Sequence, residues 1–230
     1  MARMIPFKIC CMQSEAEIDI AAAAGAFAVG IVGPMPNGAG FLDDATAARL
    51  ARYGVNQYGD KLWVTLLTKR TLGADIADHI AEIGANAVQI VDRPEDGAYA
   101  LLRARFPALK ILQVVHVEDE RAIGEAKAAA PFVDAILLDS GRPSAATPTF
   151  GGTGDRHDWS ISRRIVRLVE RPVFLAGGLN PQNAQEAIAA VEPFGLDLCS
   201  GLRDRMKGDA LIPERLAAFA AALRAARAGA

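Results

Sequence analysis

The stretch Pro172-Val-Phe-Leu-Ala-Gly-Gly-Leu-Asn-Pro-Gln-Asn-Ala-Gln-Glu-Ala-Ile188 combines three local patterns. A short apolar run comes first, the pair Gly177-Gly178 follows it, and an alanine-rich segment closes the stretch. The apolar run is typical of a buried strand, while Asn180 before Pro181 is a common helix start. The stretch therefore predicts one strand–turn–helix unit, which is the building block of a parallel sheet with crossover helices.

Similar units recur along the whole chain of 230 residues. We expect strands at 7–11, 27–32, 62–67, 87–92, 111–117, 133–139, 173–176 and 196–199. We expect helices at 14–24, 43–53, 73–83, 94–105, 118–130, 158–169, 181–191 and 213–223. Eight such units in a chain of this length match a closed (β/α)8 TIM barrel better than an open doubly wound sheet. The prediction is an α/β protein with one domain, 1–230, and a frayed tail at 224–230.

The composition limits the classes of function. The net charge of −2 gives no broad electrostatic case for nucleic acid or anionic membrane. No apolar run reaches the length of a membrane span, and the start of the chain does not look like an export signal. Three cysteines favour a reducing cytoplasm over a disulfide scaffold, and three scattered histidines do not suggest a metal site.

Three glycine-containing loops follow predicted strands at the end of the barrel where active sites gather. They contribute the following candidate phosphate-binding residues: Gly152, Thr153 and Gly154; Gly177 and Gly178; Ser200 and Gly201. Glycine lets backbone N–H groups approach an anion closely, and in barrels phosphate commonly binds after strands seven and eight. The simpler alternative is that these glycines only permit tight turns. Neither GxGxxG after the first strand nor GxxxxGK[ST] occurs, so no nucleotide motif is present.

Several of these segments together resemble the phosphoribosylanthranilate isomerase family. The matching segments are KIC (8–10), EIDIAAAAGAFAVGIV (17–32), LLDSG (137–141), GGTGDRHDWS (151–160), PVFLAGGLNPQNAQEAI (172–188) and PFGLDLCSGL (193–202). The resemblance implies a phosphate-binding (β/α)8 barrel that performs an Amadori rearrangement in tryptophan biosynthesis without a cofactor. It also implies that Cys10 is the general base and Asp139 the general acid, acting on a small phosphosugar substrate.

Both implied catalytic groups need an adjusted pKa. An ordinary aspartate, with a pKa of about 3.9, is only roughly 0.1% protonated at neutral pH, so Asp139 needs its pKa raised. A thiol with a pKa of about 8.5 needs a smaller shift downward. Lys8 lies two residues before Cys10 on the same strand face and nearer the bottom of the barrel, so we expect it to contribute little to that shift, and its role stays open.

The neighbouring residue Cys11 departs from the family pattern, which usually has glycine there. Because side chains alternate across a strand, Cys10 and Cys11 cannot both point into the barrel. We expect Cys10 to point inward and Cys11 to point outward or into the loop, packed as a small hydrophobe. Cys199 is expected to pack beside the phosphate loop.

The substrate end differs further from the resemblance. The loop 33–40 lacks the arginine with which the family holds the anthranilate carboxylate. Either Arg142 replaces it with a bidentate clamp from another loop, or a different amine-linked ribose phosphate fits a pocket edged by Met35, Asn37 and His116. If these residues have no role in binding, His116 is a hydrogen-bonded structural histidine and Arg142 is a solvated loop arginine.

Two other functions stay open at this point. One is a phosphosugar epimerase or isomerase with a different aglycone; pentulose phosphate epimerases typically use paired aspartates and metal-binding histidines. The other is a non-catalytic barrel that binds a phosphorylated ligand. The sequence leaves the oligomeric state open between monomer and homodimer.

Overall fold

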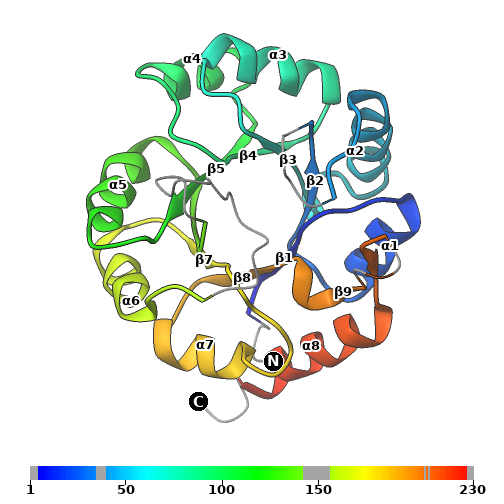
Figure 1. Cartoon of the computed structure of the whole chain (residues 1–230). Coiled ribbons are helices and arrows are strands. Elements are labelled where there is room, and N and C mark those ends of the chain that lie inside the picture. The colour runs from blue at the N-terminus through cyan, green and yellow to red at the C-terminus, as the bar shows by residue number, and fades with distance from the viewer. Residues whose placement is uncertain (1–4, 35–39, 142–155, 205, 207, 227–230) are drawn as a thin grey trace.

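A computed structural model describes residues 5–34, 40–141, 156–204, 206 and 208–226. Eight parallel strands close into a barrel in chain order, and the helices form a ring around it (Figure 1). The barrel strands are β1 Phe7–Ile9, β2 Ala28–Val32, β3 Trp63–Thr68, β4 Ala87–Ile90, β5 Lys110–His116, β6 Ala135–Asp139, β7 Val173–Leu175 and β8 Gly195–Leu198. The helices are α1 Glu15–Ala23, α2 Asp44–Tyr58, α3 Gly73–Ile83, α4 Ala98–Arg105, α5 Arg121–Ala129, α6 Trp159–Leu168, α7 Ala184–Val191 and α8 Pro213–Ala226.

Every predicted strand and helix is present, so the predicted TIM barrel is confirmed, but several element ends differ. β1 ends at Ile9 because Cys11 has a φ of 67°, outside the extended region. α7 begins at Ala184 because the side chain of Asn180 accepts hydrogen bonds from the N–H groups of Gln182 and Asn183 and forms a turn first. α8 runs past its predicted end to Ala226, and 227–230 lie outside the described residues.

A short antiparallel ribbon was not predicted from the sequence. Its strands are β9 Arg203–Asp204 and β10 Ala210–Leu211, which lie between β8 and α8. Two-residue strands are too short to produce a recognisable alternation of apolar and polar residues. The ribbon matters because it carries Arg203 back toward the end of β1.

The first strand shows how the two faces of the barrel wall differ. Phe7 and Ile9 belong to the layer of apolar side chains between strands and helices, and the ring of Phe7 meets that of Phe219 in α8 edge to face, 5.5 Å apart. Lys8, between them, points to the opposite side, into the barrel, where it reaches Asp197 of β8.

An aromatic cluster fills the barrel at the N-terminal ends of the strands. Phe27 packs against Trp63, Phe174 and Phe194, with ring centroids 4.7 to 6.0 Å apart. A Cβ on Gly195 would stand 2.6 Å from the ring of Phe174, so only glycine fits there. With this end closed by apolar rings, the polar residues of the interior are left at the C-terminal end.

The Phe7–Phe219 contact predicts a clear stability effect. Phe219 is fully buried, so Phe219→Ala should lower the free energy of unfolding by about 3–5 kcal/mol. Leu168→Ala is the matched control, because Leu168 is 52% exposed and should cost less than about 1 kcal/mol. Urea unfolding followed by circular dichroism measures both. Equal losses in the two variants would contradict this packing.

Candidate active site

Cys10 lies directly after β1, inside the mouth of the barrel. Its N–H donates to the carbonyl of Leu198 at 2.8 Å and so continues the pairing between β1 and β8. Its sulfur lies over Gly30 in β2, where an added Cβ would stand 2.7 Å from Sγ. The predicted inward direction of Cys10 therefore agrees with the structure, and glycine in the neighbouring strand makes room for the thiol.

Lys8 is wholly buried and lies between an acid and the thiol. Its Nζ donates to Asp197 Oδ2 at 2.9 Å and to Cys10 Sγ at 3.5 Å. Burial alone would lower the pKa of Lys8, but the Asp197 carboxylate and then Cys10 raise it above its usual value, so Lys8 keeps its charge. Burial also raises the pKa of Asp197 to about 7, against the opposing charge of Lys8.

These neighbours shift the pKa of Cys10. A hydrogen bond from Cys11 is the largest cause that lowers it; burial raises it, and the charge of Lys8 lowers it again, to about 6. A thiolate is therefore the main form of Cys10 at neutral pH. The expectation that Lys8 contributes little was wrong. An extended lysine stem spans about the same length as two strand residues, so its charge reaches the end of β1.

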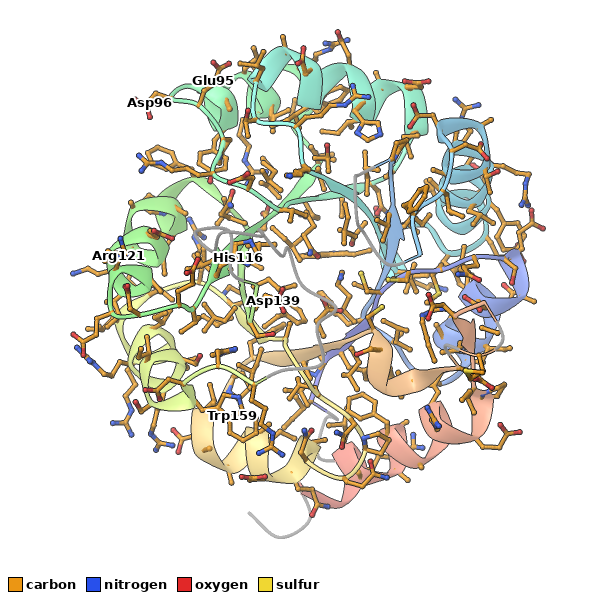
Figure 2. The ribbon with its side chains drawn as sticks, in the orientation of Figure 1. Glu95, Asp96, His116, Arg121, Asp139 and Trp159 are labelled. Carbon is orange, nitrogen blue, oxygen red and sulfur yellow. The ribbon has the colours of Figure 1, made fainter. Side chains whose placement is uncertain are left out.

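Asp139 ends β6, with 8% of its surface exposed. Burial raises its pKa, while His116 and the N–H groups of Ser140 and Gly141 oppose the rise. His116 pairs in register with Asp139 and its Nε2 contacts the carbonyl oxygen of Val91 at 3.0 Å. Figure 2 shows Asp139 and His116 inside the ring of helices. The pKa shift is in the direction that a general acid needs.

The loops after β6, β7 and β8 pack closely against one another. Gly177 has a φ of 82°, and an added Cβ there would stand 2.7 Å from Ser140 Oγ, just after Asp139. A Cβ on Gly201 would collide with the backbone oxygen of Leu179. Asn183 ties the glycine pair to α7 by donating to the carbonyl of Gly178 at 2.9 Å. Gly177 and Gly201 are thus both required by the packing of these loops, whether or not they bind a ligand.

The structure brings together only part of the predicted phosphate site. Gly177, Gly178, Ser200 and Gly201 lie in neighbouring loops, as expected. The other predicted residues, Gly152, Thr153, Gly154 and Arg142, lie outside the described residues, as do Met35 and Asn37 of the expected pocket edge.

Arg203 was not predicted as part of the site; it is 3% exposed and holds the Cys10 segment in place. Its guanidinium donates to the Cys10 carbonyl at 2.9 and 3.2 Å and to the Glu17 carboxylate at 3.2 Å. It also donates to the carbonyl of Asp209 at 2.7 Å. An arginine beyond the last predicted strand carries no motif, and its role exists only because the β9–β10 ribbon folds back.

Of the two positions expected for Cys11, outward or turned into the loop and packed, the structure shows the second. Its φ of 67° breaks the alternation of the strand, so its side chain is buried in the same cluster as Cys10 rather than in the helical layer. Its sulfur lies 2.7 Å from that of Cys199, at the end of β8. Its pKa is raised well above the usual value, first by its hydrogen bond to Cys10 and then by the one with Cys199. Cys11 therefore stays protonated and donates to Cys10.

A cavity of about 830 Å³ lies away from Cys10, between α4 and α5. Its lining includes Tyr99, Gln113, His116 and Phe132. Figure 2 shows Glu95 and Asp96 on one side of this region and Arg121 on the other. His116 thus lies between this outer cavity and Asp139. Within the described ranges, no group of three or more His, Cys, Asp or Glu side chains is arranged to hold a metal ion.

Known proteins resemble this chain in sequence and in fold. The family profile described as N-(5'phosphoribosyl)anthranilate (PRA) isomerase matches residues 54–209. The N-(5'-phosphoribosyl)anthranilate isomerase of Haloferax volcanii is 34% identical over 97% of this chain and 95% of its own length. The N-(5'-phosphoribosyl)anthranilate isomerase 2 of Methanosarcina mazei is 36% identical over 86% and 85%.

Solved structures agree with these matches. The phosphoribosyl anthranilate isomerase of Thermotoga maritima superposes with a TM-score of 0.76 at 26% identity, covering 96% of this chain and all of its own. The enzyme of Thermococcus kodakaraensis gives a TM-score of 0.75 at 25% identity and covers 95% of this chain and 98% of its own.

The charge of Lys8 predicts the reactivity of Cys10. Lys8→Met removes the buried cation, so the pKa of Cys10 should rise from about 6 toward the ordinary thiol value. The rate of Cys10 alkylation by iodoacetamide at neutral pH should fall about two- to tenfold. Lys127→Met, on the exposed face of α5, is the control and should leave the rate unchanged. The alkylation rate is also followed against pH in folded Lys8→Met. If its midpoint stayed at the value of the parent protein, Lys8 would not act on the thiol.

Proposed function

This chain belongs to the N-(5'-phosphoribosyl)anthranilate isomerase family, and we propose that Cys10 and Asp139 carry out its reaction as general base and general acid. The protein is an isomerase of tryptophan biosynthesis that converts N-(5'-phosphoribosyl)anthranilate into 1-(2-carboxyphenylamino)-1-deoxyribulose 5-phosphate. One observation supports the two roles: a thiol with a lowered pKa and a carboxyl with a raised pKa stand at the same barrel mouth.

Asp139 is proposed to act first, by opening the ribose ring. The ring oxygen needs a proton as its bond to the anomeric carbon breaks, and the nitrogen lone pair then forms a Schiff base. Burial raises the pKa of Asp139, so its carboxyl keeps a proton to higher pH than an ordinary aspartate and is better able to supply that proton. The N–H groups of Ser140 and Gly141 would stabilise the carboxylate that remains.

Cys10 is proposed to complete the rearrangement. Its thiolate takes the proton from the sugar carbon next to the Schiff base, which gives an enolamine that tautomerises to the ketone. Lys8 would favour the thiolate before the proton transfer and is itself held by Asp197. Arg203 holds the carbonyl of Cys10, so the thiol has a fixed backbone from which to act.

The glycine loops are proposed to hold the 5'-phosphate. Gly177, Gly178, Ser200 and Gly201 supply close-packed backbone after β7 and β8, where barrels commonly bind phosphate. Gly152, Thr153 and Gly154 are proposed to complete the cradle. Arg142 is proposed to hold the anthranilate carboxylate in place of the arginine that 33–40 lacks, because a guanidinium binds a carboxylate with two parallel hydrogen bonds.

The cellular setting and the assembly belong to the same proposal. The three free cysteines fit an enzyme that works in the cytoplasm. A small phosphosugar is the proposed ligand, with no nucleic acid or membrane partner, and the protomer acts as a monomer or a homodimer.

The two catalytic roles predict separate losses of activity. Cys10→Ser and Asp139→Asn should each lower kcat by about a hundredfold or more, because each removes one proton-transfer group. The fluorescence change on turnover of N-(5'-phosphoribosyl)anthranilate measures the rate, and rescue of a tryptophan auxotroph gives an independent readout. Asp60→Asn, at the exposed start of the turn before β3, is the control. Activity that survives in both Cys10→Ser and Asp139→Asn would defeat the assignment.

The phosphate site predicts an effect on binding. In Gly201→Ala the new Cβ would collide with the Leu179 carbonyl and separate the loops after β7 and β8. KM should rise roughly tenfold, the effect of about 1.4 kcal/mol of lost phosphate binding, with a smaller change in kcat. Gly124→Ala is the control, since an added Cβ at Gly124 meets nothing within 4 Å. An unchanged KM in Gly201→Ala would place the phosphate elsewhere.

A further inference from the structure

All three cysteines of the chain meet at the junction of β1 and β8. Cys11 donates its single proton to Cys10 and also contacts Cys199. In the Cys11–Cys199 contact either sulfur can be the donor. The three sulfurs therefore form one cluster, in which Cys11 contacts both of the others.

The geometry of Cys11 and Cys199 is that of a pair ready to bond. Their sulfurs lie 2.7 Å apart, which is closer to the roughly 2.05 Å of a disulfide than to an ordinary contact between two thiols. The two cysteines follow β1 and β8, which are hydrogen-bonded neighbours, and Ile9 pairs with Leu198 in register. The left-handed backbone at Cys11 turns its side chain to this position. Gly40 packs closely against this side chain, since an added Cβ at Gly40 would stand 2.8 Å from Cys11 Cβ.

The two cysteines differ in their access to solvent. Cys11 is buried, whereas Cys199 is only partly buried. A small oxidant therefore reaches Cys199 first, and Cys11 is in place to resolve the product.

We propose that Cys11 and Cys199 form a reversible redox pair, which a hydroperoxide oxidises to a disulfide that removes the hydrogen-bond donor of Cys10. This regulatory site is separate from the acid–base pair. Its effect on the reaction rests on the proposed role of Cys10, but the formation of the bond does not.

The oxidation of Cys11 and Cys199 takes two steps. The Cys199 sulfur attacks one oxygen of the hydroperoxide, the O–O bond breaks, and Cys199 sulfenic acid forms; the other oxygen takes the thiol proton of Cys199 and leaves as water or an alcohol. The Cys11 sulfur then attacks the Cys199 sulfur, the S–O bond breaks, and the departing hydroxide takes the Cys11 proton as water. Two electrons pass from the two thiols to the peroxide, and a dithiol such as dithiothreitol returns them.

The disulfide would change the environment of the base without touching it. Both protons of the Cys11–Cys199 pair are consumed, so the hydrogen bond that contributes most to the thiolate of Cys10 is lost. Lys8 still faces Cys10, and burial still opposes the charge. The thiolate should then form at higher pH, and the isomerase should slow at neutral pH.

The test of the bond uses the full-length protein and stoichiometric hydrogen peroxide. The number of free thiols counted after denaturation should fall from three in the reduced chain to one in the oxidised chain, and dithiothreitol should restore all three. Peptide mapping should find Cys11 joined to Cys199. In Cys10→Ser the same bond should form, and in Cys199→Ser no intrachain disulfide should form. A bond between Cys10 and Cys11, a bond between chains, or no loss of thiols would overturn the proposal.

The test of the effect on activity compares pH profiles. Oxidised enzyme should lose about two- to tenfold in rate at neutral pH and recover it in alkaline buffer, where the thiolate forms again. Cys199→Ser treated in the same way should keep its profile. Loss of activity at every pH, or equal loss in Cys199→Ser, would show that peroxide acts on Cys10 itself and would overturn this part of the proposal. A reduced enzyme without isomerase activity would instead refute the proposed function and leave the thiol mapping valid.

Discussion

The buried ammonium group of Lys8 is the constraint on which the rest of the site depends. Removing a charge from water costs several kcal/mol unless partners replace the water, and Lys8 is wholly buried. Asp197 and the sulfur of Cys10 are those partners, at 2.9 and 3.5 Å. The same ion pair that makes Lys8 tolerable in the core therefore places a positive charge beside the thiol. The Lys8–Asp197 ion pair thus serves both the stability of the barrel and the reactivity of Cys10.

The two ends of the barrel differ in the side chains that fill them. At the N-terminal ends of the strands, Phe27, Trp63, Phe174 and Phe194 close the interior with apolar rings. At the other end, Asp139 and Cys10 face the interior with their pKa values shifted toward each other. The Lys8 charge lowers both pKa values, and burial is the cause that raises the pKa of Asp139 against it.

The sequence predicted the fold well because each barrel unit is encoded locally. An apolar run, a turn and a helix start recur eight times, and closure follows from their number. The inward direction of Cys10 also follows from strand alternation. The direction of the Cys11 side chain could not be predicted in this way, because alternation fails where φ becomes positive. Glycine or asparagine in a sequence can indicate a positive φ, but a cysteine does not. Arg203 could not be predicted because its partners, Cys10 and Glu17, are distant in sequence.

The most direct test of the account is the titration of the Cys10 thiolate itself. The ultraviolet absorbance of thiolate is measured against pH in the reduced protein and in Cys10→Ser, and the difference belongs to Cys10. The expected midpoint is about 6, because Cys11 donates to the sulfur and Lys8 lies beside it. A midpoint at or above the ordinary thiol value of about 8.5 would contradict it. It would leave the proposed base protonated at neutral pH.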